Sequence, residues 1–210
     1  YVFGNEGILA AKNLRENKSV LNNISLLSMG ISALLIINTI SFSVSKEVGN
    51  AYRALDYDIE FWAPGLDRQK LMLTEKIDGV ADAYGNYQAY NTELAGSKDS
   101  ISCIIGAEPN KFDEYFDMGI VGDKESLIKE LGRDRNIIIS NGLKEKFGVD
   151  MGDSIKLRTK RGDRPYKIIG FCETIMYNGQ IAIVSDKYLK SDMQMKYYND
   201  MLVKTSKPPE

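Results

Sequence analysis

The stretch ISLLSMGISALLIINTISFSV, residues 24–44, decides how the rest of the chain is organised. No charged residue occurs between Ser19 and Ser45, although charged residues make up 27% of the chain. As a helix the stretch would rise roughly 31 Å, close to the ~30 Å of hydrocarbon in a bilayer. The pattern predicts one transmembrane helix over residues 24–45. The alternative is a buried core helix of a soluble protein.

A cleaved signal peptide fits this region less well. Mixed polar and apolar residues precede the apolar stretch, and no small-residue cleavage site follows it before Lys46. We therefore expect the helix to remain as a membrane anchor.

The charges on either side of the apolar stretch indicate its orientation. Lys12, Arg15 and Lys18 precede it, whereas acidic residues outnumber basic ones after Ser45. Because basic residues are enriched in cytoplasmic segments, we expect residues 1–23 in the cytoplasm and residues 46–210 outside the cell.

The segment before the apolar stretch has the spacing of an amphipathic helix. Ile8, Ala11, Leu14 and Leu21 recur at near-helical intervals, with the basic residues mostly elsewhere. Such a helix suits the cytoplasmic membrane surface, where its basic residues meet anionic head groups. A simple solvated extension of the span is the alternative.

Small hydroxyl residues line one side of the predicted span. They are Ser25, Ser28, Ser32, Thr39 and Ser43. Small residues allow helices to approach closely in lipid, so this side is a candidate intramembrane packing face. The alternative is that each hydroxyl bonds to the preceding turn of its own helix.

The remaining chain alternates between short strand patterns and short helix patterns, which predicts a mixed α+β domain. Ser140 or Asn141 can begin a helix that ends at Gly148, a residue suited to a left-handed cap. The expected strands and helices, in chain order, are a strand at 57–63, a helix at 66–77, a strand at 100–106, a helix at 124–131 and a strand at 136–139.

Two β-hairpins are expected further along the chain. The first joins residues 154–159 to 165–172 through a charged turn. The second joins residues 173–177 to 180–185 at Asn178-Gly179, a dipeptide that tolerates positive φ. Ser206 followed by prolines is typical of a helix start, so we expect a C-terminally truncated domain with further elements beyond residue 210.

The composition excludes several classes of chemistry. The chain has no histidine, which excludes Ser-His-Asp, Cys-His and His-ligated metal sites. It contains neither a phosphate-binding P-loop nor a dinucleotide fingerprint. The net charge of −2 argues against nucleic-acid binding. We expect no catalytic residues, no cofactor and no metal, and hence no enzyme.

Other residue types have ordinary structural interpretations. Cys103 and Cys172 lie in apolar strand patterns and are expected to be buried thiols, with a disulfide as the alternative. Arg161-Gly162-Asp163 matches an adhesion tripeptide but is expected to be a turn. Tyrosines could form an adaptable contact surface, although core packing of about half is favoured; they are Tyr84, Tyr87, Tyr90, Tyr197 and Tyr198.

Two stretches resemble a known family. They are NIIISNGLKEKFGVDMGDSIKLRTKRGDRPYKIIGF (136–171) and NGQIAIVS (178–185). With the preceding basic helix and single span, they resemble the FtsX-like permeases of bacterial ABC transporters, in particular the MacB-type extracellular core domain. The shared motifs are a G-x-x-x-G-D-x-I-x-L pattern from Gly148 to Leu157 and a Y-x-I-x-G strand from Tyr166 to Gly170.

The resemblance implies a permease subunit of the bacterial cell membrane whose extracellular domain follows the first span. A separate ABC ATPase subunit would drive movements of that domain, for mechanotransmission or export. Lys12, Arg15 and Lys18 are then candidate cytoplasmic coupling contacts. Other implied partners are membrane lipid, further permease spans or a second permease copy, and an extracellular peptide, lipid or protein ligand. A single-span receptor with an extracellular sensing domain is the alternative.

Overall fold

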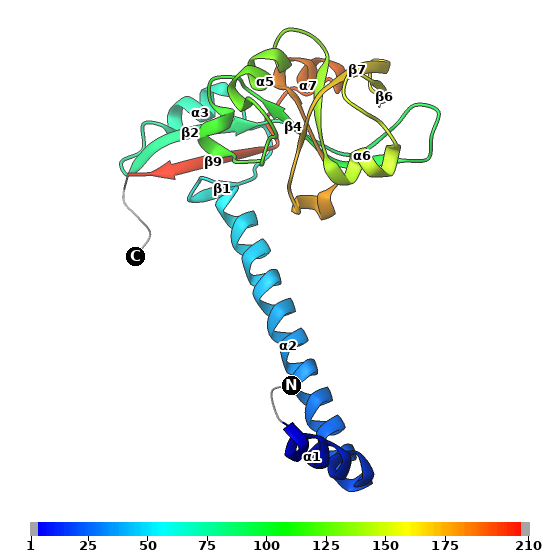
Figure 1. Ribbon diagram of the computed structural model, residues 1–210. Helices are drawn as coiled ribbons and strands as arrows, with labels where there is room; N and C mark the ends of the chain where they lie inside the picture. The colour runs from blue at the N-terminus through cyan, green and yellow to red at the C-terminus, as the bar shows by residue number, and fades with distance from the viewer. Residues whose placement is uncertain (1–3, 207–210) are drawn as a thin grey trace. The chain divides into compact units, whose positions relative to one another are not determined.

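The computed structural model describes residues 4–206 (Figure 1). Two helices form the N-terminal part of the chain, and strands mixed with shorter helices follow them. The helices are α1 (Gly4–Glu16), α2 (Lys18–Arg53), α3 (Arg68–Thr74), α4 (Phe112–Tyr115), α5 (Lys124–Leu131), α6 (Asn141–Phe147) and α7 (Asp186–Asp192), with a 3-10 turn η1 (Met176–Gly179). The strands are β1 (Ile59–Phe61), β2 (Val80–Asn86), β3 (Gln88–Glu93), β4 (Ser100–Ala107), β5 (Asn136–Ser140), β6 (Ser154–Thr159), β7 (Gly162–Cys172), β8 (Ile181–Ser185) and β9 (Asp200–Thr205).

The chain divides into two units, residues 1–49 and 50–210. In the first unit, Asn17 separates α1 from α2, and its side-chain oxygen accepts hydrogen bonds from the backbone N–H groups of Ser19 and Val20 at 3.2 and 3.3 Å. This is the geometry of a helix N-cap, so α2 begins as a new helix at Lys18. It extends beyond both ends of the predicted 24–45 segment.

A six-stranded sheet organises the second unit, with the order β3-β4-β8-β5-β7-β6. β8 lies between β4, to which it is parallel, and β5, to which it is antiparallel. All five residues of β8 are buried, which explains its continuous apolar sequence IAIVS.

Hydrophobic cores cover both faces of this sheet, and residues along β8 alternate between them. Ile183 faces the core that contains Ile128 of α5. Val184 faces the core that contains Leu143 of α6 and Leu189 of α7. The sheet therefore forms the middle layer of the unit.

A second, three-stranded sheet has the order β1-β9-β2. β1 is the first strand of the unit along the chain and β9 is the last one described. They pair antiparallel, with Ile59 opposite Val203 and Phe61 opposite Met201, and are drawn side by side in Figure 1. The first strand of the unit and its last described strand are therefore neighbours.

Local signals in the sequence predicted several elements correctly. The helix at 124–131 is α5, and the strands at 100–106 and 136–139 correspond to β4 and β5. The Ser140 hydroxyl accepts a hydrogen bond from the backbone N–H of Leu143, and Gly148 ends α6 with φ of 63°. The mixed α+β class is confirmed.

The first predicted hairpin is confirmed and the second is wrong. β6 and β7 pair antiparallel, with Ser154 opposite Lys167 and Thr159 opposite Gly162. Residues 173–177, by contrast, form no strand partner for β8, and residues 176–179 form η1.

The second hairpin does not form because β8 is buried on both faces. Asn178 and Gly179 do adopt positive φ, at 56° and 66°, but so does Tyr177, at 50°. β8 is apolar on both faces and is stabilised most in the centre of the large sheet, between β4 and β5. The predicted helix start after Ser206 falls on residues 207–210, which lie outside the described part of the chain.

Candidate functional site

The apolar helix α2 is exposed along the length of its candidate span. Within the part of the chain that the structure describes, one helix is long and apolar enough to cross a membrane, over Lys18–Gly49, and none of its most apolar window is buried. Large side chains such as Leu34, Ile36 and Phe42 are 58–73% exposed. A soluble core helix would bury such residues, so this exposure favours a helix that lies in lipid.

The basic residues predicted as coupling contacts lie close together in the chain. Lys12 and Arg15 are on α1, Lys18 is the first residue of α2, and all three side chains are exposed. Their role as coupling contacts stays a prediction.

The predicted packing face also lies on exposed positions of α2. The Thr39 hydroxyl donates a hydrogen bond to the backbone carbonyl of Leu35 at 2.8 Å. This is the alternative interpretation for that residue, a bond to its own preceding turn. Ser25, Ser28, Ser32 and Ser43 remain candidates for packing against another helix.

A buried polar cluster lies where the two sheets meet. Asp200 begins β9 and is only 2% exposed. Its Oδ2 atom accepts a hydrogen bond from Gln88 Nε2 at 3.0 Å, whereas its Oδ1 atom has no hydrogen-bond partner. Asn86 lies opposite Asp200 in the register of β2 and β9, is fully buried, and its side-chain amide likewise forms no hydrogen bond of normal geometry.

Glu60 of β1, an exposed residue, is the second carboxyl group beside Asp200. Its two oxygens accept hydrogen bonds from the Tyr57 hydroxyl at 3.1 Å and from the indole Nε1 of Trp62 at 3.3 Å. On the other side of Asp200, the Gln88 carbonyl accepts hydrogen bonds from the Tyr90 hydroxyl and from the Cys103 thiol. The cluster thus joins the small sheet to the large one.

A cavity of about 280 Å³ opens beside this cluster. Its polar lining consists of Tyr57, Glu60, Gln88, Tyr177 and Asp200. Its apolar lining consists of Leu55, Ile105, Phe116 and Met176. Leu55 and Tyr57 come from the segment that directly follows α2 in the chain, and Met176 and Tyr177 come from η1.

The ionisation of Asp200 differs from that of an ordinary carboxyl group. Burial raises the pKa of Asp200 to about 7, and the neighbouring Glu60 adds to the increase. The neighbouring amide of Asn86 acts in the opposite direction but is outweighed. Near neutral pH, Asp200 therefore holds a proton about half the time.

The other titratable groups of the cluster are neutral near pH 7. Burial raises the pKa of Tyr57, Tyr90 and Tyr177 above the ordinary value of 10. Burial also raises the pKa of the Cys103 thiol to about 12. The acidic residues that line the cavity are Glu60 and Asp200, and none of the described lining residues is basic.

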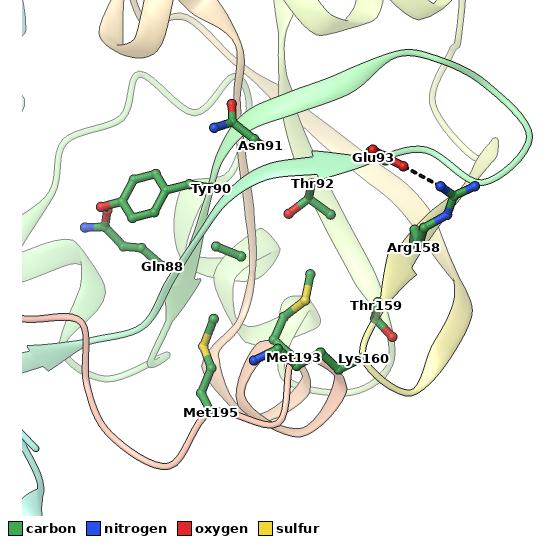
Figure 2. Close-up of a pocket in the computed structure, with 11 residues that line it drawn as sticks. Gln88, Tyr90, Asn91, Thr92, Glu93, Arg158, Thr159, Lys160, Met193 and Met195 are labelled. Carbon is green, nitrogen blue, oxygen red and sulfur yellow. Dashed lines mark hydrogen bonds and ion pairs between the residues drawn. The ribbon is translucent and has the colours of Figure 1, made fainter.

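Figure 2 shows a second hollow, of about 580 Å³, on the other side of Gln88. It lies between β3, the end of β6 and the chain after α7, from which Met193 and Met195 line it. The charged groups at its rim include Arg158 and Glu93, which pair with each other. We therefore regard the cavity beside Asp200, whose buried oxygen is unpaired, as the stronger candidate site.

The structure also places the cysteines, the tyrosines and the Arg-Gly-Asp turn that the sequence analysis considered. Cys103 and Cys172 are both buried and unbonded, as favoured. Tyr84 and Tyr87 are buried, whereas Tyr90 and Tyr197 are each 51% exposed. Gly162 and Asp163 begin β7 at the tight turn after β6. Among residues 4–206 there is no group of three or more side chains suited to holding a metal ion.

Sequence reasoning did not single out Glu60, Gln88 or Asp200. The available signal was weak. Asp200 is an acidic residue at the start of the apolar stretch DMLVKT, and Gln88 is a polar residue at the start of β3, the strand that pairs with SISCIIG. Their proximity depends on the pairing of β1 with β9 and on the contact between the sheets.

Comparison with known protein families identifies the family to which most of the chain is similar. Residues 20–208 match the family described as MacB-like periplasmic core domain. No protein among the curated sequences matches this chain.

Three solved structures resemble this chain at low sequence identity, and the first of them shares its fold. The extracellular domain of the noncanonic ABC-type transporter YknZ from Gram-positive bacteria is 18% identical, with a TM-score of 0.51 over 71% of this chain and 83% of that one. The periplasmic region of MacB from Actinobacillus actinomycetemcomitans is 12% identical, with a TM-score of 0.47 over 71% of this chain and 68% of that one. A domain of a putative permease protein from Porphyromonas gingivalis is 19% identical, with a TM-score of 0.42 over 66% and 61%.

Proposed function

Because this chain belongs to the family of MacB-like periplasmic core domains, we propose that it is the first span and extracellular domain of a bacterial ABC-transporter permease that couples ATP hydrolysis by a separate subunit to movement of the domain. The observation that carries the proposal is the family match over residues 20–208, which includes both the exposed apolar helix and the mixed domain. It favours a permease over a single-span receptor.

The connections of the domain support mechanical coupling. β1 follows α2 in the chain and pairs directly with β9, the last described strand. A force applied through α2 to β1 would therefore act on the small sheet that also contains β9. In this proposal residues 1–23 are cytoplasmic, residues 24–45 span the membrane and residues 46–210 are extracellular.

The cytoplasmic partner is an ABC ATPase, which would contact Lys12, Arg15 and Lys18. When the tagged permease is purified from its native membranes, we expect an ABC ATPase to accompany it. Reversal of all three charges to glutamate should lower the recovered ATPase at least tenfold, because the proposed contact would then carry the opposite charge on the permease side. Permease without any ATPase would contradict the proposed function.

A matched control reverses three exposed charges in the extracellular domain, at Lys98, Lys160 and Arg161. This variant should retain the ATPase. Equal loss in both variants would show that the charge change acts on folding or insertion and not on the contact.

Coupling itself is tested by chemical labelling. A cysteine at Trp62, which is 77% exposed just after β1, should change its labelling rate when the ATPase is trapped with ATP and vanadate. A cysteine at Lys98, in the loop before β4, serves as the reference. Identical rates at Trp62 in both nucleotide states would argue against transmission to the domain.

A further inference from the structure

The chain is hydrogen-bonded to the sheet-containing domain directly after the last residue of α2. α2 ends at Arg53, and the carbonyl of the next residue, Ala54, accepts a hydrogen bond from the backbone N–H of Asp117 at 2.8 Å. Two residues later, the backbone N–H of Asp56 donates to the carbonyl of Tyr115 at 3.0 Å. The first residue after α2 is thus already bonded to the domain, so a displacement of the end of α2 acts on these bonds at once.

This attachment is short. The two hydrogen bonds form an isolated antiparallel bridge, with Leu55 opposite Phe116. An ion pair between Asp56 and Lys204 at 2.9 Å adds little, because the Asp56 side chain is 74% exposed. β9, by comparison, pairs with β2 along the whole of both strands. A single bridge opens at a lower free-energy cost than a ladder of several residues, so the segment can separate from the domain while the sheets stay intact.

The same segment forms part of the wall of the 280 Å³ cavity. Leu55 and Tyr57 both line the cavity, together with Phe116 from the other side of the bridge. The rings of Tyr57 and Phe116 meet edge to face, with centroids 6.2 Å apart. Asp56, whose side chain alternates with those of its neighbours, is exposed instead. Separation of this segment from Phe116 would therefore remove one wall of the cavity and leave the other lining residues in place.

We propose that residues 54–57 form a strap that closes this cavity, and that movement of α2 lifts the strap and opens the cavity. The role of α2 rests on the proposed function, in which ATP hydrolysis by a separate subunit moves the domain. The strap itself rests on the bridge at Leu55 and on the two side chains that it contributes to the cavity wall. Access to the cavity would then depend on the nucleotide state of the ATPase.

The native Cys103 reports whether the cavity is open. Its side chain is fully buried, and its thiol donates a hydrogen bond to the side-chain carbonyl of Gln88, a lining residue of the cavity, at 3.7 Å. Cys172 is equally buried in the same hydrophobic core and serves as the internal control. Local opening of the strap should expose Cys103 alone, whereas unfolding should expose both thiols.

The first experiment uses the full chain in lipid nanodiscs without an ATPase. Methyl methanethiosulfonate labels accessible thiols, and mass spectrometry of the peptides gives the rate at each cysteine. Asp56→Pro removes the N–H that donates to Tyr115, and we expect labelling of Cys103 to become about tenfold faster, with Cys172 unchanged. Asp56→Asn is the matched control: it keeps this N–H and loses only the charge beside Lys204, so both rates should change less than about twofold.

Two results of this experiment would overturn the proposal. One is an unchanged rate at Cys103 in Asp56→Pro, because the bridge would then not control access to the cavity. The other is faster labelling of both cysteines in that variant, because residues 54–57 would then support the whole fold and not the cavity alone.

The second experiment asks whether α2 lifts the strap. In the permease purified with its ATPase, the rate at Cys103 should differ between the nucleotide-free state and the state trapped with ATP and vanadate. A disulfide between Leu55→Cys and Phe116→Cys should abolish this difference, and its reduction should restore it. The bond pattern makes these two residues a non-hydrogen-bonded antiparallel pair, whose Cα atoms are typically about 4.5 Å apart and within disulfide range.

Comparison with Trp62→Cys separates failure of the strap from failure of the proposed function. If the rate at Trp62→Cys depends on the nucleotide state and the rate at Cys103 does not, the strap proposal is overturned while coupling to the domain stands. If neither rate depends on it, coupling fails, and with it the role of α2 in lifting the strap. A nucleotide effect at Cys103 that persists in the oxidised double-cysteine variant would also overturn the proposal.

Discussion

At the scale of single residues, Asp200 is the least expected feature of the domain. It opens an apolar strand, yet it is buried beside Glu60 with one oxygen unpaired. Burial and the neighbouring carboxylate raise its pKa from an ordinary value of 3.8 to about 7. A carboxyl group in this state lowers folding stability when it ionises, because the unfolded chain ionises more readily.

This reasoning predicts how Asp200→Asn changes stability with pH. Ionisation of the unfolded chain begins near pH 3.8, so the variant should gain stability over the unaltered chain as pH rises from about 4 to 7 and keep that gain above pH 7. The gain should be on the order of a few kcal/mol at pH 8 and smaller at pH 5. Urea unfolding at both pH values measures it. A difference that does not vary with pH would refute the assigned pKa.

At the scale of elements, α7 is held to the large sheet by an ion pair whose carboxylate is buried. Asp192, the last residue of α7, has a fully buried side chain and accepts hydrogen bonds from Arg135 at 2.8 and 2.9 Å and from the Tyr166 hydroxyl at 2.8 Å. Burial alone would raise the pKa of Asp192, but these hydrogen bonds outweigh burial and lower it. The pair therefore stabilises the fold above pH 4 and is lost as pH falls below that range.

Removal of the Asp192 charge should weaken the attachment of α7 to the large sheet. We expect Asp192→Asn to reduce the free energy of unfolding by about 1–3 kcal/mol, because Arg135 keeps its charge and loses a charged acceptor. Asp150→Asn is the matched control, since Asp150 pairs with Lys144 at 3.0 Å but is 81% exposed, and its loss should cost about 0–1 kcal/mol. Urea unfolding at pH 7 compares the two; equal costs would show that the buried pair contributes no more than a surface one.

At the scale of the whole molecule, the orientation of the chain in the membrane is the open prediction. A cysteine at Lys98 should react with a membrane-impermeant reagent on intact cells, and a cysteine at Glu16 should react after the cells are lysed. Both positions are exposed, and the native Cys103 and Cys172 are buried, so the background should be low. Labelling of Glu16→Cys on intact cells, with Lys98→Cys protected, would reverse the orientation.

The sequence alone determined the features that depend on neighbouring residues. The uncharged run around Leu34, the Ser140 cap and the left-handed Gly148 follow from properties of a few consecutive residues, because helix length, capping and positive φ are local. The β6–β7 hairpin also belongs here, since its strands are joined by a short turn.

Only the tertiary structure decided which distant strands became neighbours. β8 pairs with β4 and β5 and not with the segment before Asn178, because its two apolar faces are both buried in the centre of the sheet. The cavity arises in the same way: Glu60, Gln88 and Asp200 are far apart in the chain and meet because β1 pairs with β9 beside the large sheet. Strand pairing between distant segments is selected by burial over the whole domain, which no short pattern contains.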